Sequence, residues 1–238
     1  MSPRLPLVLL PGLDGTGRLF APLLAELPPS LAPQVVRYSP DEALDYAGLL
    51  PRVEAQLPRG GAFALLGESF SGPLALELSA RRPAGLAAVV LVATFHRRPT
   101  AAALAALRPL VRAPAFSLPL PRFLVRALLA GGDADAALVE EMRGALASVR
   151  PEVLAARARA ALGADASAAA RAVQVPALYL LARRDALMRQ ALAEELRALV
   201  PQLEVAAIDA PHLVLQRAPE ASAQALAAFL RRAGLLEA

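Results

Sequence analysis

Short apolar runs alternate with longer stretches of helical periodicity along most of the chain. Several of the runs are apolar at every position, which is typical of parallel strands covered on both faces. The runs predict strands at Leu5–Leu10, Val35–Tyr38, Ala62–Leu66, Ala87–Ala93, Ala177–Leu181 and Glu204–Ile208. The stretches between them predict helices at Phe20–Glu26, Glu42–Gln56, Phe70–Arg81, Arg189–Leu199 and Pro219–Arg232. This rhythm indicates an α/β fold, a mostly parallel sheet of about six strands with helices on both faces.

One long gap interrupts the rhythm between Ala93 and Val175, where no convincing strand occurs. Helical pieces fill it, separated or opened by prolines, at Ala101–Arg112, Pro121–Ala130, Ala134–Val149 and Pro151–Leu162. Such an insertion is expected over the carboxyl ends of the strands, where open α/β sheets bind their ligands. We therefore expect a core of residues 1–95 and 170–238 and a helical cap of residues 96–169. An ordinary set of packing helices is the alternative.

Composition narrows the classes of function. The 238 residues suit one large domain, and no uncharged apolar run reaches the roughly 18 residues of a membrane span. The run Leu5–Leu13 is too short for a signal peptide and lacks a basic segment before it. The chain has no cysteine and two histidines, so disulfides, thiolate sites and multi-histidine metal sites are not expected. We expect a cytoplasmic protein without metal or cofactor.

Charge argues against nucleic acid as a partner. All 25 basic residues are arginine, and the net charge of +4 is scattered along the chain rather than gathered in a stripe. Aromatic residues make up only 4% of the sequence and do not interleave with the basic ones. A small-molecule substrate is the expected partner, and the sequence leaves the oligomeric state open.

The segment Gly67–Gly72, GESFSG, lies between a predicted strand and a predicted helix. A Gly-x-Ser-x-Gly turn in this setting exposes a nucleophilic serine, here Ser69. Ser71 stands where the second glycine is usual and Gly72 follows it, which keeps small residues where the helix start needs them. A plain strand-to-helix turn is the alternative interpretation of the motif taken alone.

Serine needs a base, and the base needs a third group that orients it. Asp185 follows the predicted strand Ala177–Leu181, and His212 follows the predicted strand Glu204–Ile208. Both loops open on the same edge of the sheet as Ser69, in the chain order serine, acid, histidine. The three residues together predict a catalytic triad.

Other acids and the second histidine fit the triad less well. Asp209 lies three residues before His212 and more plausibly shapes that loop, while Glu194 and Glu195 lie within a helix. Glu68 precedes the serine and points away from the place of a triad acid. His96 follows the strand Ala87–Ala93 at the root of the insertion, so it is a candidate for the substrate pocket or for a structural role.

An acyl-transfer site also needs two N–H donors for the oxyanion. The amide of Phe70, directly after the serine, is one candidate. The second is expected in the loop LPGLDGTG after the first strand, with Leu13 preferred and Asp14 as the alternative. Asp14 is also a candidate for the substrate pocket. The loop lacks the Lys-Ser/Thr of a P-loop and does not match a dinucleotide fingerprint.

With these motifs the sequence resembles the α/β-hydrolase superfamily over nearly its whole length. The pairing of LPGLDGTG with GESFSG is similar to small esterase-like and acyltransferase-like members, and plant phytyl ester synthases carry a similar loop. The resemblance implies an eight-stranded sheet in the full family, of which this chain begins at the third strand. The usual His-Gly of the oxyanion loop is Pro11-Gly12 here, and Ser71 is the second departure.

These features predict a serine hydrolase of carboxylic esters or thioesters, acting through Ser69, His212 and Asp185. The cap is rich in Leu, Val, Ala and Phe, including Phe116 and Phe123, which favours an apolar acyl group; core packing would explain the same residues. An acyltransferase with the same triad is one alternative. Another chemistry on this fold, such as carbon–carbon bond cleavage, and a non-catalytic binding protein are the others.

Overall fold

The computed structural model describes residues 4–98, 108 and 111–237. Within them, six strands form one sheet in the order β2-β1-β3-β4-β5-β6, and every neighbouring pair is parallel. The strands are β1 (Leu5–Leu10), β2 (Leu31–Val35), β3 (Phe63–Glu68), β4 (Leu86–Val92), β5 (Ala177–Ala182) and β6 (Leu203–Ile208). The predicted α/β class and parallel six-stranded sheet are confirmed.

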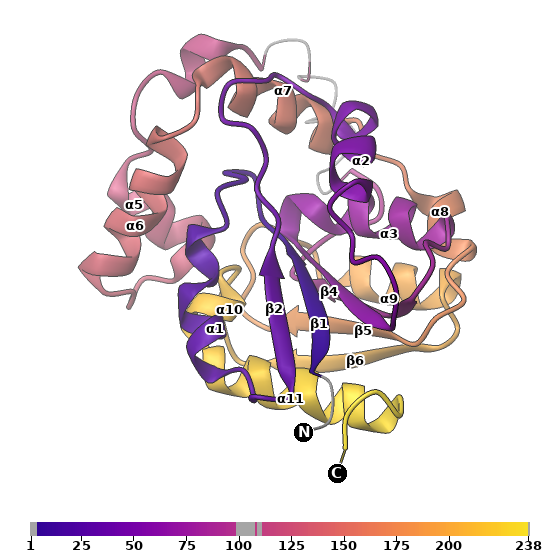
Figure 1. Cartoon of the computed structure of the whole chain (residues 1–238). Coiled ribbons are helices and arrows are strands. Elements are labelled where there is room, and N and C mark those ends of the chain that lie inside the picture. Colours follow the sequence, from indigo (N-terminus) through magenta and orange to yellow (C-terminus); the bar gives the residue numbers. More distant parts are fainter. Residues whose placement is uncertain (1–3, 99–107, 109–110, 238) are drawn as a thin grey trace.

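Helices cover both faces of the sheet because successive strand side chains point to opposite sides. Leu7 and Leu9 of β1 pack with residues of α1 (Ala21–Glu26) and α11 (Pro219–Arg232). Val8 and Leu10 pack on the other face, against α2 (Tyr46–Glu54), α3 (Gly72–Ala80), α8 (Ser167–Arg171) and α9 (Ala191–Leu199). Figure 1 shows these two helical layers with the sheet between them.

The second strand lies earlier than predicted. We expected Val35–Tyr38, whereas β2 spans Leu31–Val35 and contains Pro33. The strand is at the edge of the sheet and only its first residue is buried, so it lacks the continuous apolar run that marks the buried strands. Proline is tolerated there because an edge strand has one side without ladder partners. The apolar residues after it, Val36 and Tyr38, are buried beyond the end of the strand.

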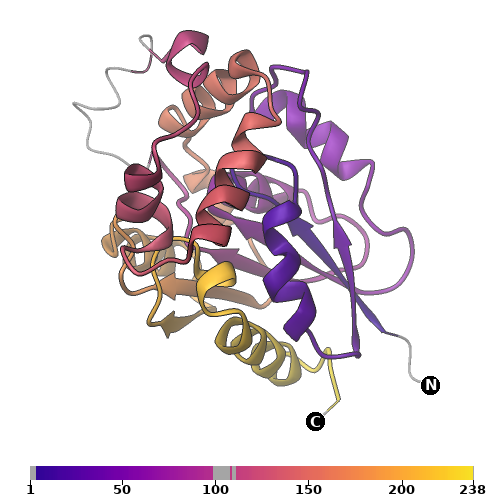
Figure 2. The ribbon, with the colours of Figure 1, turned by 90° about the vertical axis from the view of Figure 1, so that its left-hand side faces the viewer.

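The segment between β4 and β5, residues 93–176, is helical where it is described. It contains the 3₁₀ turn η4 (Ala113–Phe116), α5 (Arg122–Val125), the π-helical turn η5 (Arg126–Ala130), α6 (Ala136–Ala147), α7 (Pro151–Leu162) and α8. The pieces expected at Pro121–Ala130, Ala134–Val149 and Pro151–Leu162 correspond to α5 with η5, to α6 and to α7, while η4 and α8 were not expected. Most of Ala101–Arg112 lies outside the described residues. Figures 1 and 2 show α5, α6 and α7 beyond the carboxyl ends of the strands.

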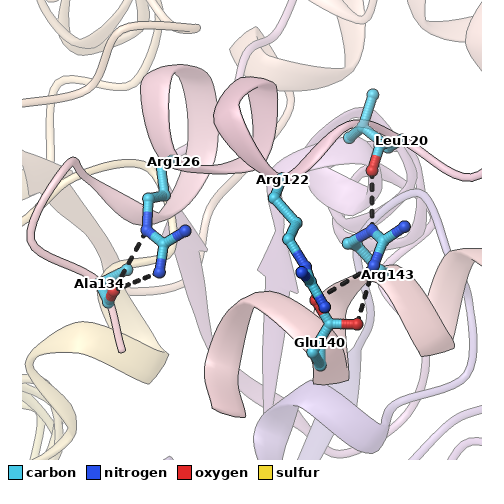
Figure 3. Close-up of polar contacts among 6 residues, drawn as sticks. All are labelled: Leu120, Arg122, Arg126, Ala134, Glu140 and Arg143. Atoms are coloured by element: carbon cyan, nitrogen blue, oxygen red, sulfur yellow. Dashed lines mark hydrogen bonds and ion pairs between the residues drawn. The ribbon is translucent and has the colours of Figure 1, made fainter. Parts of the chain in front are cut away.

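Arginines hold the first part of this segment together. Arg122 and Arg143 both bind the carboxylate of Glu140, at 2.6 Å and 2.8 Å, and Arg143 also donates to the carbonyl of Leu120 (Figure 3). The guanidinium of Arg126 donates to the carbonyl oxygen of Ala134. The contacts join α5 to α6 and η5 to the turn before α6, so this part is a packed unit rather than a loose loop. Among the described helices, none combines the length and apolar composition that crossing a membrane requires.

Candidate active site

Ser69 lies at the sharp turn between β3 and α3. Its φ of 49° is in the left-handed region, which costs a non-glycine residue of order 1–3 kcal/mol. The surrounding contacts hold the turn in place: the hydroxyl of Thr94, after β4, donates to the carbonyl oxygen of Ser69. The strained turn presents a partly exposed serine side chain at the carboxyl edge of the sheet.

The two glycines of the turn are required by space. A Cβ on Gly67 would lie 2.8 Å from the carbonyl oxygen of Ser71, and one on Gly72 would lie 1.9 Å from the hydroxyl oxygen of Thr94. The close approach to the neighbouring strand therefore occurs at Gly72, one residue later than in Gly-x-Ser-x-Gly. This explains why position 71 tolerates a serine.

Ser69, His212 and Asp185 form a continuous chain of hydrogen bonds. Ser69 Oγ lies 2.9 Å from His212 Nε2, and His212 Nδ1 lies 2.8 Å from Asp185 Oδ2. A carboxylate only accepts, so Nδ1 carries the proton and Nε2 is left to accept from the serine hydroxyl. The side chains of His212 and Asp185 are 4% and 3% exposed, so this chain is shielded from water.

Asp185 is fixed by its own loop. Its Oδ1 accepts hydrogen bonds from the amides of Leu187 and Met188, both at 2.8 Å, which leaves Oδ2 for the imidazole. The acids that competed with it in the sequence lie elsewhere. Asp209 pairs with Arg184 at the surface, and Glu195 pairs with Arg97.

The loop of His212 is tied to the segment between β4 and β5. The amide of Leu213 donates to the carbonyl of Leu129 at 3.0 Å, and Arg217 forms an ion pair with Asp133 at 2.7 Å. Arg217 belongs to the short helix α10 (Val214–Arg217), which the sequence pattern did not reveal. The position of the imidazole is thus supported from outside the sheet.

Residues 11–15 form the loop that the sequence analysis assigned to the oxyanion hole. The amide of Gly15 donates to the carbonyl of Gly12 at 3.1 Å, which closes a tight turn. Within the described residues, the amides of Gly12, Leu13 and Asp14 donate no hydrogen bond. A Cβ added at Gly12 would lie 4.0 Å from Ser69 Cβ, so the loop passes directly beside the turn of Ser69.

Phe70 is the predicted donor that follows the serine, and aromatic contacts fix its position. Its ring is stacked on Tyr46, with centroids 4.8 Å apart, and meets Tyr38 edge to face at 6.3 Å. The hydroxyl of Tyr46 donates to the carbonyl of Phe70 at 2.7 Å. The amide of Phe70 lies in the first turn after β3, where backbone N–H groups have no intrahelical partner.

Ser71 connects the turn to the oxyanion loop. Its hydroxyl donates to the carbonyl oxygen of Pro11, so the hydroxyl of Tyr38, 2.6 Å away, must donate to Ser71 Oγ. Burial raises the pKa of Tyr38, which keeps the phenol protonated for this role. The departure from glycine at position 71 therefore adds a contact as well as fitting the space.

Two further acids lie close to the site. Asp14 is buried, with Oδ1 bound by the amide of Thr16 at 2.8 Å and by its hydroxyl, while Oδ2 faces Gly12. Glu68 is also buried, and Gln216 donates to it at 3.0 Å. Burial raises the pKa of Glu68 to about 7. The sequence excluded Glu68 from the triad without revealing this burial, since a buried charged residue at the end of a strand leaves no mark in the apolar pattern.

His96 lies apart from the hydrogen-bonded chain. It is buried, its Nε2 is 3.9 Å from Glu195, and its Nδ1 has no partner among the described residues. Burial lowers the pKa of His96 and favours the neutral imidazole. It forms no hydrogen bond with Ser69, Asp185 or His212, so its contact with substrate stays a prediction. The described residues contain no group of three or more His, Asp or Glu arranged to hold a metal ion.

Arg157 is the residue that sequence reasoning missed. It comes from α7, yet it is 1% exposed and donates to the carbonyl oxygens of Leu13 and Asp14 at 3.0 Å and 2.7 Å. The helical pattern of α7 marks position 157 only as one arginine among several. Its burial depends on the distant loop that it meets.

Two cavities, of about 220 and 320 Å³, lie along α2 and α7 and share Asp45, Arg108 and Ala160 in their linings. Neither is lined by Ser69, His212 or Asp185. We place the candidate site at Ser69 rather than in these cavities, because the hydrogen-bonded chain of Ser69, His212 and Asp185 lies there.

A family model described as the Alpha/beta hydrolase family matches residues 7–225. The chain belongs to this family. The match begins within β1 and includes the other five strands and the three residues of the hydrogen-bonded chain. Membership of the family supports a hydrolase. None of the curated proteins matches the sequence.

Solved structures share the fold at low sequence identity. A thermophilic esterase from Thermogutta terrifontis is 22% identical with a TM-score of 0.75, over 97% of this chain and 91% of that one. MenH from S. aureus is 16% identical with a TM-score of 0.79, over 98% and 96%. The enol-lactonase from Burkholderia xenovorans is 18% identical with a TM-score of 0.71, over 96% and 92%. At these identities the likeness concerns the fold.

Proposed function

We propose that the protein is a serine hydrolase of carboxylic esters or thioesters. The observation that carries the proposal is the chain Ser69–His212–Asp185, with contacts of 2.9 Å and 2.8 Å at the carboxyl edge of an α/β-hydrolase sheet. A nucleophile, a base and an orienting acid in this order are the parts that acyl transfer needs.

In the proposed reaction, Ser69 Oγ attacks the carbonyl carbon of the ester while His212 Nε2 accepts the hydroxyl proton. The tetrahedral oxyanion is stabilised by the amides of Phe70 and Leu13, with Asp14 as the alternative to Leu13. The carbon–oxygen bond to the leaving group then breaks, and His212 returns the proton to that group. Water, activated by the same imidazole, hydrolyses the acyl-enzyme and releases the acid.

The segment between β4 and β5 is proposed to cap the site, since α5, α6 and α7 lie beyond the carboxyl ends of the strands (Figure 2). Phe116 and Leu13 both pack against the buried cluster of Val149, Val153 and Leu154, which supports an apolar wall near the loop of residues 11–15. Phe123 is 67% exposed and lends no support to that wall. An apolar acyl group remains the part of the substrate that we propose binds there. The proposed partner is a small molecule, and the proposed location is the cytoplasm.

The test is hydrolysis of p-nitrophenyl esters of increasing acyl length, together with labelling by a fluorophosphonate probe. We expect the native protein to hydrolyse some of the esters and to be labelled, and Ser69→Ala to lose both properties. Ser148→Ala, which removes a hydroxyl bound only to the carbonyl of Ala145, is the matched control and should keep them. A native protein that neither hydrolyses nor reacts would refute the proposal. Adding a long-chain alcohol and analysing the products separates hydrolysis from acyl transfer.

A further inference from the structure

Arg157 occupies an unusual position for a charged residue. It is 1% exposed and forms no ion pair with any of the described residues. Burying a charge without an ion pair is costly, and here burial lowers the pKa of the guanidinium, although the nearby Tyr38 and Asp14 act in the opposite direction. Arginine in this place requires a compensating set of acceptors.

Three backbone carbonyls provide that compensation. The guanidinium donates to Leu13 at 3.0 Å and to Asp14 at 2.7 Å through one nitrogen, and to Ser39 at 2.9 Å through another. It also lies 5.5 Å from the centre of the Tyr38 ring. Two of the three acceptors belong to the loop that is proposed to hold the oxyanion.

This grip fixes where the loop amides point. In a trans peptide the C=O of one residue and the N–H of the next point in opposite directions. Arg157 binds the carbonyl oxygen of Leu13, so the amide N–H of Asp14, in the same peptide group, points away from Arg157. In the same way, the Gly15 amide binds the carbonyl oxygen of Gly12, so the amide N–H of Leu13 points away from Gly15. These amides are the ones without partners among the described residues.

The close packing around Gly15 leaves the loop little room to change its conformation. Gly15 has a φ of 70°, and a Cβ there would lie 2.6 Å from a nitrogen of the Arg157 guanidinium and 2.9 Å from Tyr38 Cβ. The loop and the arginine are thus fitted to each other. A cation on the carbonyl side of these peptide groups also polarises them, which makes their N–H groups stronger donors to a developing negative charge.

We propose that Arg157 is a positioning residue that holds the oxyanion loop, so that α7 contributes to catalysis without touching the substrate. The inference rests on the proposed hydrolase function. It accounts for a buried arginine on α7, two of whose acceptors, Leu13 and Asp14, lie 144 and 143 positions earlier in the chain.

The test compares Arg157→Met and Arg157→Lys with Arg159→Met, using the p-nitrophenyl ester that the native protein hydrolyses fastest. Arg159 lies on the same helix but donates to the carbonyl of Val111, away from the oxyanion loop, which makes it the matched control. Loss of one oxyanion donor costs about 10²–10³ in kcat. Arg157→Met removes the support of the loop rather than a donor itself, so we expect kcat to fall about 10–100-fold, with KM changed little. Arg159→Met should have a kcat near that of the native protein.

The affinity of the protein for an alkylboronic acid is a second measurement, and it would not change if Arg157 had only a structural role. The adduct of the boronic acid with Ser69 places an oxygen in the oxyanion hole, so this affinity should fall by the same factor as kcat/KM in Arg157→Met. Arg157→Lys keeps the charge but not the fork of donors, so it should fold and show an intermediate kcat; it decides the matter if Arg157→Met does not fold. A folded variant with native kcat, or an equal loss in Arg159→Met, would overturn the inference. Failure of the proposed function would appear earlier, as a native protein inert toward esters and fluorophosphonate.

Discussion

The hydroxyl of Ser71 donates a hydrogen bond to the carbonyl oxygen of Pro11, which joins the turn of Ser69 to the loop after β1. The two segments supply the two proposed donors of the oxyanion hole. A direct tie between them fixes the distance between those donors, because a hydrogen bond tolerates little change in length. Position 71 therefore does more than leave room for the helix.

The first prediction concerns this tie. Ser71→Ala leaves both the Pro11 carbonyl and the Tyr38 hydroxyl without their partner, and unpaired buried polar groups cost about 1–3 kcal/mol each. We expect a less stable protein in urea denaturation and a lower kcat. Tyr38→Phe is the control, since it removes one hydroxyl and leaves the contact from Ser71 to Pro11. Equal kcat values for native protein and Ser71→Ala would contradict the role given to this contact.

Gly72 gives a second prediction. In Gly72→Ala the new methyl group would meet the hydroxyl of Thr94 at 1.9 Å, so the start of α3 must shift away from the strand. We expect a loss of about 1–3 kcal/mol in the free energy of unfolding, the usual cost of overpacking. Gly144→Ala is matched to it, because Gly144 lies in α6 with nothing within 4 Å of the added methyl group. That variant should gain about 0.5–1 kcal/mol.

The third prediction concerns Asp185. In Asp185→Asn the amide oxygen would keep the contacts with the amides of Leu187 and Met188, and the NH₂ group would replace Oδ2 opposite the imidazole. That group donates, so His212 Nδ1 would have to accept and Nε2 would carry the proton. We expect kcat to fall about 10³–10⁴-fold with the fold intact. Asp209→Asn, at an exposed ion pair with Arg184, should leave kcat unchanged. A tenfold loss or less in Asp185→Asn would speak against this acid.

The fourth prediction concerns Glu68 and the dependence of stability on pH. Its pKa rises from an ordinary 4.5 to about 7 in the folded protein, because burial disfavours the carboxylate. Between these two values the folded state binds more protons than the unfolded state, so stability falls as the pH rises. The loss of free energy of unfolding that Glu68 causes is complete above pH 7 and amounts to about 3 kcal/mol.

Glu68→Gln removes the titrating group but keeps a side chain that can accept from Gln216. We expect its free energy of unfolding to decline less than that of the native protein between pH 4.5 and 8. Urea denaturation across that range gives the comparison. Parallel curves for the two proteins would mean that Glu68 titrates normally.

The fold was predictable because strands that are buried on both faces appear in the sequence as continuous apolar runs. Five of the six strands lie within two residues of their predicted limits. Four of these, β1, β3, β4 and β5, are buried along most of their length, and β6, at the other edge of the sheet, is apolar at every position except Glu204. The exception, β2, is half exposed and contains Pro33, so periodicity placed the strand on the buried residues that follow it. The short helices α8 and α10 carry too few turns to show a pattern.

The site was predictable where loops follow strands. Ser69, Asp185 and His212 each come just after a recognisable strand, so their approach could be inferred from chain order alone. Arg157, Tyr38 and the acceptor Pro11 could not be linked in this way, because their contacts join segments that no local pattern relates. Long-range support of a site depends on the packing of helices against loops, which periodicity does not encode.

The grip of Arg157 on Leu13 and Asp14 also bears on how such a chain can be re-engineered. Exchange of the segment between β4 and β5 for that of a relative would be a natural way to alter substrate preference. A graft of that kind would also remove the guanidinium that holds the loop beside Ser69. A chimera made from this protein therefore has to carry an arginine at the equivalent place on α7, or a new loop sequence that no longer depends on it.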